Sequence, residues 1–419
     1  MTAKRIVLAT FGSLGDLHPY LAVAIELKRA GHRPLIATTD IFREAVEAEG
    51  IEFAQMRPGS AELGDLAQIV RRVLHPLRGP QRLIREFLMP WVRESYADLD
   101  RACADADLIV THPLTFAGRL IAEKRGLPWA STVLAPLSLM SALDPPYWPA
   151  LPGGGLWLRK LGVGPYRMFF AILKQVAASW EKPLRELRAE LGLPPTKQLA
   201  LFEGQYSPRL NLALFPHLFA EPKADWPANT IACGFAHYDG NAIAPQLKAE
   251  LDAFLAQGEP PIVFTLGSSV AMDAGDFFAR AAAAATQLNR RAILVTGQDA
   301  QPAMPATVKT FRYLPYSVVF PHAAVNVHQG GIGTLAQALA AGRPQLVMPA
   351  AFDQPDNARR AVRLGVARTL PLQKASVDEM VENLAELLSN RDYAARAAAT
   401  GVTLRHQNGA RRAAELLGD

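Results

Sequence analysis

The chain has 419 residues, half of them hydrophobic, and its 44 basic and 39 acidic residues leave a net charge of only +5. This length exceeds one ordinary core, so two domains of roughly 200 residues each are expected. Because the basic residues are scattered, the charge slightly favours small anionic molecules or membrane surfaces and argues against a nucleic-acid-binding protein.

Cysteine usage and hydropathy are those expected of a cytoplasmic protein. Cys103 and Cys233 are the two cysteines and form no CxxC pattern, so neither a disulfide framework nor a zinc site is expected. The apolar run Ile6 to Thr10 is too short for a signal-peptide core, and no window approaches the ~20 apolar residues that span a bilayer. We therefore predict no transmembrane segment and at most peripheral contact with a membrane.

The first half of the chain alternates apolar runs with helical stretches. RIVLAT, RPLIATT and DLIVTH are each followed by a segment of helical composition, which predicts βαβ units and a parallel sheet. After residue 144 the pattern changes. DPPYWPALPGGG indicates a loop, and residues 157–191 carry long aromatic-rich helical segments that predict an inserted cap.

A second alternating series begins at PPIVFTLGSS and continues through RAILVTG, TVKTFRYL, AAVNVHQGG and PQLVMPA. The predicted fold class is α/β, with two doubly wound Rossmann-like domains facing an interdomain cleft. Residues 1–236 form the predicted first domain and 261–401 the second. Residues 237–260 are the predicted linker, and 402–419 a final helix that crosses back to the first domain.

Residues 11–19, FGSLGDLHP, close the first strand and open the first helix, at the edge where open α/β sheets bind ligands. The stretch lacks G-x-G-x-x-G, and only Asp40 could hold a ribose, which disfavours a nicotinamide site. Asp16 is either a helix cap or a carboxylate that accepts a proton from a hydroxyl. His112, at the end of DLIVTH, either tunes that carboxylate or is an ordinary loop histidine.

Asp105 and Asp107 form a D-x-D pattern, which can hold a divalent cation. The pair precedes a buried strand, where acidic turn residues are common, so a structural turn is the better interpretation. No other cluster has metal-ligand spacing, and we predict no metal.

The stretch NVHQGGIGT, residues 326–334, predicts a strand, a glycine-rich turn and a helix start. Unpaired N–H groups and the helix dipole converge on an anion in such a turn, here with His328 on its rim. Ser268 and Ser269 end another strand and could bond a phosphate. In FDQPDNARR, Asp353 and Gln354 offer donors and acceptors for several adjacent hydroxyls. Asp356 is explained equally well as a helix cap.

FGSLGDLHP, HQGGIGT and FDQPDNA, in this order and at these distances, resemble the motifs of the nucleotide-sugar-dependent glycosyltransferases of family 1. The resemblance spans nearly the whole chain. It is closest to a bacterial subgroup with the rhamnolipid rhamnosyltransferase catalytic subunit, glycopeptide-antibiotic glucosyltransferases and sterol glucosyltransferases. It implies the GT-B fold, an inverting mechanism without metal or cofactor, a dTDP- or UDP-linked sugar as co-substrate, and an acceptor pocket in the first domain.

The resemblance also assigns roles to single residues. Asp16 matches the general base, and His112 stands where plant members place an aspartate beside theirs. Tyr313 stands where plant members stack a tryptophan on the base. Ala336 replaces a glutamate that binds the ribose hydroxyls in many members, which suits a deoxyribose donor such as dTDP-rhamnose but also occurs in UDP-glucose users. The donor contacts so implied are Ser13, Ser268, Tyr313, Leu314, His328, Gly330, Gly331, Gly333, Thr334, Asp353 and Gln354, with Ser269 beside Ser268.

Several residues lie in or near segments expected to wall the acceptor pocket, and such pockets are largely apolar. They are His18, Phe116, Pro136, Trp148, Met168 and Phe169, and their alternative interpretation is the core of the cap. The sequence thus predicts an inverting enzyme that moves rhamnose or glucose to a hydroxyl of a lipid hydroxy acid, flavonoid, sterol or macrocycle. The alternatives are a nucleotide-sugar epimerase or hydrolase of the same architecture, or a noncatalytic partner protein.

Overall fold

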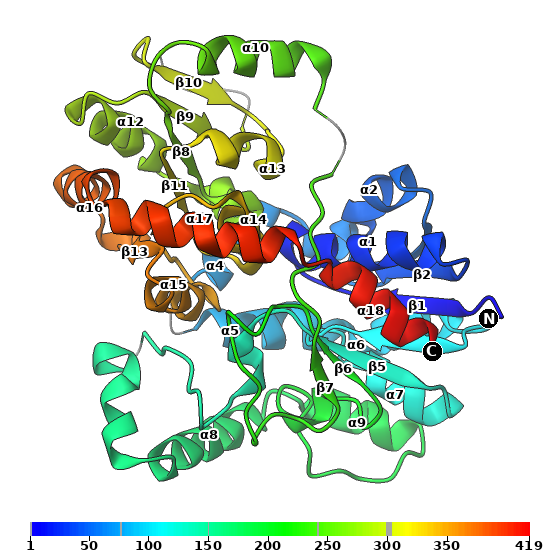
Figure 1. Ribbon diagram of the computed structural model, residues 1–419. Helices are drawn as coiled ribbons and strands as arrows, with labels where there is room; N and C mark the ends of the chain where they lie inside the picture. Colours follow the sequence, from blue (N-terminus) through cyan, green and yellow to red (C-terminus); the bar gives the residue numbers. More distant parts are fainter. Residues whose placement is uncertain (1, 76–77, 150, 241–242, 299–303) are drawn as a thin grey trace. The chain divides into compact units, whose positions relative to one another are not determined.

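The computed structural model describes residues 2–75, 78–149, 151–240, 243–298 and 304–419. They divide into two compact units, the first comprising Met1–Tyr238 and Asn408–Asp419 and the second Asp239–Gln407. Each unit is built on one parallel sheet interleaved with helices (Figure 1). The predicted α/β class with two Rossmann-like domains is therefore confirmed.

The sheet of the first unit has the order β3-β2-β1-β4-β5-β6-β7, and every neighbouring pair is parallel. Its strands are β1 (Arg5–Ala9), β2 (Arg33–Thr38), β3 (Glu52–Gln55), β4 (Leu108–Thr111), β5 (Trp129–Val133), β6 (Asn211–Ala213) and β7 (Thr230–Ala232). Because β1 and β4 are parallel, the chain segments that follow them begin at the same edge of the sheet, and the strand order reverses between these two strands. Ligand sites of open α/β sheets lie at such a reversal.

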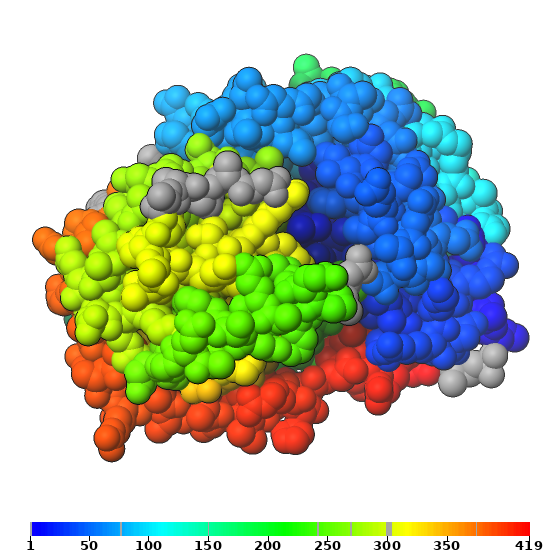
Figure 2. All heavy atoms as spheres, turned by 90° about the horizontal axis from the view of Figure 1, so that it is seen from above, coloured from blue at the N-terminus to red at the C-terminus, as the bar shows by residue number. Residues whose placement is uncertain are grey.

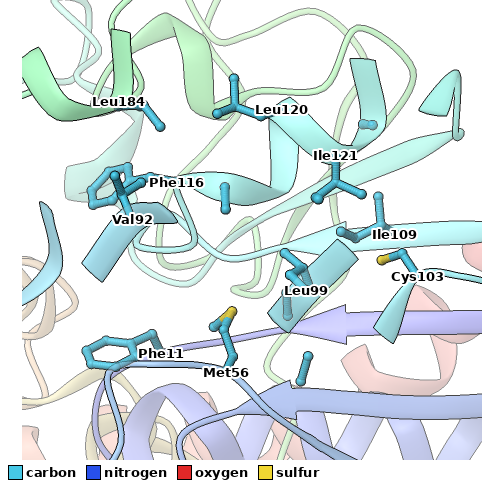
Figure 3. Close-up of a cluster of buried hydrophobic side chains, with 14 of the residues drawn as sticks. Phe11, Met56, Val92, Leu99, Cys103, Ile109, Phe116, Leu120, Ile121 and Leu184 are labelled. Carbon is cyan, nitrogen blue, oxygen red and sulfur yellow. The ribbon is translucent and has the colours of Figure 1, made fainter. Parts of the chain in front are cut away.

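The core of the first unit lies between this sheet and α6 (Val92–Ala102), α7 (Ala117–Arg125) and α9 (Lys182–Glu190). Figure 3 shows Ile109 of β4 and Leu99 of α6 within this cluster of buried side chains. The remaining elements of the first unit are α1 (Leu14–Arg29), η1 (Asp40–Phe42), α2 (Arg43–Ala48), α3 (Ser60–Leu63), α4 (Leu66–Val73), α5 (Gly79–Arg82), η2 (Leu83–Leu88), η3 (Met89–Trp91), η4 (Pro136–Leu139), η5 (Pro152–Leu161), α8 (Gly164–Ala177), η6 (Glu203–Gln205) and α18 (Gly409–Gly418).

The sheet of the second unit has the order β10-β9-β8-β11-β12-β13 and is also parallel throughout. Its strands are β8 (Ile262–Thr265), β9 (Ala292–Val295), β10 (Val308–Phe311), β11 (Val325–His328), β12 (Gln345–Val347) and β13 (Ala367–Thr369). Its helical elements are α10 (Pro245–Leu255), α11 (Gly267–Val270), η7 (Ala271–Asp273), α12 (Phe277–Gln287), α13 (Tyr316–Val319), η8 (Phe320–His322), α14 (Ile332–Ala341), α15 (Gln354–Arg363), η9 (Leu372–Lys374), α16 (Val377–Ser389) and α17 (Arg391–Arg405).

The range predicted as a linker, 237–260, contains helix α10. Leu251 and Phe254 of this helix are buried in the core of the second unit, and the Arg291 guanidinium lies 4.1 Å from the Phe254 ring centroid. Figure 2 shows the green surface of α10 beside the yellow surface around β10. Polar residues on the outer face of α10 made this segment resemble a linker.

The last helix, α18, packs against α1 of the first unit. Lys4 Nζ donates a hydrogen bond to the Gly418 carbonyl at 2.6 Å. The predicted start of the final helix at residue 402 falls inside α17, which ends at Arg405 in the second unit. The next helix starts at Gly409 because the Asn408 side chain caps it, accepting the Arg411 N–H at 2.9 Å.

Replacing Gly409 with alanine should destabilise the docked final helix. A Cβ at this position would lie 2.1 Å from the Gly234 carbonyl oxygen, so main chain must move. Such overpacking costs about 1–3 kcal/mol, which thermal unfolding should report as a lower Tm. Gly164→Ala is the matched control, because a Cβ there meets no atom within 4 Å. Equal Tm values for the two variants would contradict the close contact.

Candidate functional site

The first turn of α1 holds the Asp16 carboxylate by a reciprocal cap. Ser13 is the N-cap and accepts the Gly15 N–H at 3.1 Å, while Asp16 Oδ2 accepts the Ser13 N–H at 2.7 Å and its hydroxyl at 3.1 Å. Gly12 has φ +138°, and a Cβ there would lie 2.2 Å from Asp16 Oδ2. The helix cap is therefore Ser13 rather than Asp16, which completes the capping box from the N3 position. The Ser13 hydroxyl, predicted to contact the donor, donates to Asp16 in this structure.

The second carboxylate oxygen of Asp16 faces a histidine from a neighbouring strand. His112 follows β4, and its Nε2 lies 3.3 Å from Asp16 Oδ1. Its Nδ1 accepts the Leu114 N–H at 3.2 Å, so in the neutral ring the proton is on Nε2, the ring nitrogen nearest Asp16. The His112 side chain is 4% exposed and that of Asp16 30%. The structure therefore brings the two predicted catalytic residues together, with the carboxylate as the exposed member.

The residues predicted to wall the acceptor pocket have different surroundings. Trp148 and Phe169 pack edge to face with ring centroids 5.3 Å apart, against buried Tyr166 and Phe170. Both belong to the core of the cap, as the alternative interpretation stated. Met168, by contrast, is 65% exposed.

The other three lie within the first unit at separate places. Phe116 is buried and belongs to the main core in Figure 3. Pro136 is buried in η4. His18 is half-buried and contacts the Tyr238 ring edge to face, with centroids 5.0 Å apart.

A small cavity of about 40 Å³ lies beside His112 and Phe116 in the first unit. Glu181 lines it and is buried, which raises the pKa of its carboxyl, although the carboxyl also accepts the N–H groups of Ala200 and Leu201 at 2.9 Å. The cavity has room for a few water molecules rather than an acceptor. Sequence reasoning missed this feature, since no local pattern links Glu181 to His112.

In the second unit, His328 organises the glycine-rich turn from inside. It is fully buried, its Nδ1 accepts the Gly330 N–H at 3.1 Å, and its Nε2 then donates to Gln345 Oε1 at 3.0 Å. Burial lowers the pKa of the ring to about 4, so it is neutral at pH 7. The prediction of His328 on the rim is therefore wrong, because the ring continues the buried face of β11. The Gly330 N–H, already engaged, is not available to an anion.

The turn after His328 presents free N–H groups at the start of α14. Gly330 has φ +86°, and a Cβ there would lie 2.6 Å from Val347 Cγ1. Gly331 caps the helix, so the N–H groups of the first turn, up to Thr334, lack partners within it. A Cβ at Gly333 would meet no atom within 4 Å, so the chain leaves open space beside this turn. This is the geometry that binds anions at a helix N-terminus.

The other predicted donor contacts in this unit differ in exposure. Ser268 is exposed in α11, just after β8, and the side chain of Ser269 lies outside the described part of the structure. The Tyr313 ring is 49% exposed, with its hydroxyl donating to the Asp239 carbonyl at 2.6 Å. Leu314 is fully buried, so its side chain cannot contact a nucleotide base and only its main-chain groups remain for that role.

Asn357, which sequence reasoning missed, joins the two glycosyltransferase-like motifs of this unit. Its Nδ2 donates to the Gly330 carbonyl at 3.0 Å and to Asp353 Oδ2 at 2.6 Å. Gln354 is buried, and its Oε1 accepts the N–H groups of Ala350 and Ala351, so this oxygen is not available to a sugar. The spacing Asp353-x-x-x-Asn357 across one helical turn was the available signal.

Asp356, the predicted helix cap, is fully buried. It pairs with Arg360, whose Nε lies 2.7 Å from Asp356 Oδ2. The N-cap of α15 is Asp353, so the prediction of Asp356 as the helix cap is wrong, and its buried pairing with Arg360 explains the residue.

The D-x-D carboxylates have structural partners. Asp107 Oδ2 accepts the Arg5 N–H at 2.7 Å, and Asp105 pairs with Arg5 and Arg33. Within the residues described, no three His, Cys, Asp or Glu side chains are grouped to hold a metal, and no helix is long and apolar enough to cross a bilayer. The structural-turn interpretation of Asp105 and Asp107 agrees with these contacts.

Two protein-family models match the chain. They are the glycosyltransferase family 28 N-terminal domain, over residues 6–142, and the erythromycin biosynthesis protein CIII-like C-terminal domain, over residues 283–412. The chain is 28% identical to O-mycaminosyltylonolide 6-deoxyallosyltransferase of Streptomyces fradiae, over 99% of this chain and 96% of the relative. It is also 28% identical to a sterol 3-beta-glucosyltransferase of Leptosphaeria maculans, over 96% of this chain but only 28% of the relative.

Solved structures share the whole architecture. The glycosyltransferase SnogD from Streptomyces nogalater superposes with a TM-score of 0.70 and 20% identity, covering 100% of this chain and 99% of its own. Spinosyn rhamnosyltransferase SpnG complexed with thymidine diphosphate superposes with a TM-score of 0.68 and 18% identity, covering 99% and 100%. These superpositions support the predicted fold across both units.

The buried His328 ring should make stability depend on pH. Its folded pKa of about 4 lies below the unfolded value of about 6.5, so its contribution is complete above pH 6.5 and is lost as pH falls toward 4. The destabilisation caused by His328→Gln, measured by urea unfolding, should therefore shrink by about 2 kcal/mol between pH 7.5 and pH 5. A destabilisation that stays constant over this range would show that the ring titrates normally.

Proposed function

This chain belongs to the nucleotide-sugar-dependent glycosyltransferases of family 1, with the GT-B fold, and we propose that it transfers rhamnose or glucose to a hydroxyl of an apolar small molecule. The observation that carries the proposal is the contact between Asp16 Oδ1 and His112 Nε2 at 3.3 Å. It leaves a carboxylate that is 30% exposed, with Oδ2 hydrogen-bonded to Ser13, at the ligand-binding edge of a parallel sheet.

We propose that Asp16 is the general base. The acceptor oxygen attacks the anomeric carbon, its proton passes to the Asp16 carboxylate, and the bond from that carbon to the diphosphate oxygen breaks with inversion. Because a carboxylate is a weak base toward an alcohol, the proton moves as the new C–O bond forms. His112 Nε2 lies 3.3 Å from Asp16 Oδ1, and we assign it the role of positioning the carboxylate.

The donor diphosphate is assigned to the N-terminus of α14. As the bond breaks, negative charge grows on the diphosphate, and the N–H groups up to Thr334, together with the helix dipole, stabilise it. This role requires no metal or further cofactor. We assign the exposed Tyr313 ring to stacking on the base, and Asp353, whose Oδ2 accepts from Asn357, to the sugar hydroxyls.

For the donor we propose a dTDP- or UDP-linked hexose, with dTDP-rhamnose as the first candidate. Ala336 stands where a ribose-binding glutamate is common in the family, and one superposable structure is a rhamnosyltransferase complexed with thymidine diphosphate. For the acceptor we propose a macrocycle or a sterol, and a sterol is named in one relative, the sterol 3-beta-glucosyltransferase. The test is a thermal-shift screen of dTDP, UDP and GDP sugars, followed by mass spectrometry with macrolide, sterol, flavonoid and hydroxy-acid acceptors.

The screen also separates this proposal from the epimerase and hydrolase alternatives. A transferase forms a glycoside only when an acceptor hydroxyl is present. Free sugar or an isomerised donor, formed equally fast without acceptor, would favour the alternatives.

Replacing Asp16 with asparagine should remove the base while keeping the side-chain size. Turnover should fall by about 10²–10⁴-fold, the usual contribution of a positioned base, with little change in nucleotide affinity. Steady-state kinetics and calorimetry measure the two quantities. Asp107→Asn is the control, because that carboxylate only accepts the Arg5 N–H. Turnover equal to the control would defeat the base assignment.

Replacing Gly333 with alanine should weaken diphosphate binding without lowering the stability of the fold. The new methyl group meets no protein atom within 4 Å, so the Tm should change little. The same methyl group would stand beside the proposed diphosphate and weaken its binding by about tenfold or more, as calorimetry with dTDP or UDP should show. Unchanged affinity would place the diphosphate elsewhere.

A further inference from the structure

Helix α8 carries an exposed apolar stripe. Met168, Ile172 and Val176 are 65%, 55% and 54% exposed, and their spacing of four residues puts them on one face. The opposite face packs into the cap through Tyr166 and Phe170, both buried. The stripe is therefore not needed for the packing of α8 itself.

The preceding element, η5, adds two more exposed large apolar side chains. Trp157 is 54% exposed and Leu161 is 64% exposed. The two elements pack together, since Leu158 and Val163 contact the buried cluster of α8 and the Tyr166 hydroxyl donates to the Gly155 carbonyl at 2.9 Å. Residues 152–177, which form η5 and α8, thus carry five exposed large apolar side chains, and Figure 1 shows α8 in the first unit.

The same segment carries only positive charge. Residues 145–180 contain no aspartate or glutamate, although the chain's 39 acidic residues in 419 would average about three in such a window, and they contain four basic residues. Arg159 pairs with Asp144, and Lys174 pairs with Glu203. Lys160 and Arg167 are exposed and, among the described residues, have no ion-pair partner.

We propose that this surface docks on a membrane whose lipids have acidic headgroups. It comprises Trp157, Lys160, Leu161, Arg167, Met168, Ile172 and Val176. Exposed Trp, Leu, Ile and Met side chains insert at the boundary between headgroups and acyl chains, and Lys and Arg beside them attract anionic lipid. Arg167 lies about 100° around the helix from Met168, at the edge of the stripe, where its guanidinium reaches headgroups while the stripe is inserted.

The charge pattern favours lipid over a second copy of this chain. A symmetric dimer through this surface would bring two sets of unpaired cations together without any acidic residue from the segment to offset them. A helix of 14 residues is also too short to span a bilayer, so the segment lies along the membrane surface.

The test is flotation of the full chain with vesicles of phosphatidylcholine alone or with added phosphatidylglycerol, at low and high salt. The chain should float with the anionic vesicles, less so at high salt, and little with phosphatidylcholine alone. Ile172→Glu and the double variant Lys160→Glu/Arg167→Glu should each bind anionic vesicles about tenfold more weakly. Val402→Glu, at an exposed valine of the second unit, is the control and should bind as the parent chain does.

All variants change exposed side chains, and unchanged Tm values would exclude misfolding as the cause. The proposal is overturned if the parent chain fails to float with anionic vesicles, or if Ile172→Glu floats as well as Val402→Glu. Light scattering that shows a dimer of the parent chain and a monomer of Ile172→Glu would also overturn it, because a second copy would then cover the stripe.

Discussion

The Asp16 carboxylate is held by two hydrogen bonds from Ser13 and lies beside His112, and the proposed chemistry depends on this constraint. Oδ2 accepts the Ser13 N–H and hydroxyl, and Oδ1 lies 3.3 Å from His112 Nε2. The cap comes from the start of α1 and the histidine from the end of β4, which meet because β1 and β4 are neighbouring parallel strands. A glycine at position 12 is required by the same arrangement, since no Cβ fits beside the carboxylate.

The two units use a histidine in the same way. His112 and His328 each stand at the end of a parallel strand, and each accepts through Nδ1 the N–H of the second residue after it, Leu114 or Gly330. Their Nε2–H groups are thereby fixed toward a side-chain oxygen, which is Asp16 in one unit and Gln345 in the other. In the first unit this Nε2 lies 3.3 Å from a carboxylate oxygen. In the second unit the bond to Gln345 holds the turn from which α14 presents its N–H groups.

Alternating apolar runs predicted both parallel sheets, because buried parallel strands read as continuous β-branched stretches. The motifs also placed Asp16, His112 and the Gly331 turn at strand ends, where a ligand site is expected. Side-chain direction was not predictable: local spacing does not show that His328 and Leu314 point into the core. Long-range pairs such as Asn357 with Gly330 depend on the packing of α15 beside the turn, and the sequence alone carries no distance between them.

The exposed segment of η5 and α8 concerns where the protein is located in the cell rather than the reaction that it catalyses. Its exposed apolar side chains favour a covering surface, and its positive charges favour one with acidic lipid headgroups.

The central claim, however, concerns the general base Asp16, and a crystal structure of the chain with a nucleotide diphosphate and an acceptor would test it most directly. The account predicts the reacting hydroxyl within about 3.2 Å of the Asp16 carboxylate, with His112 Nε2 still beside it. A hydroxyl bound instead to another carboxylate or to a histidine, with Asp16 out of reach, would contradict it.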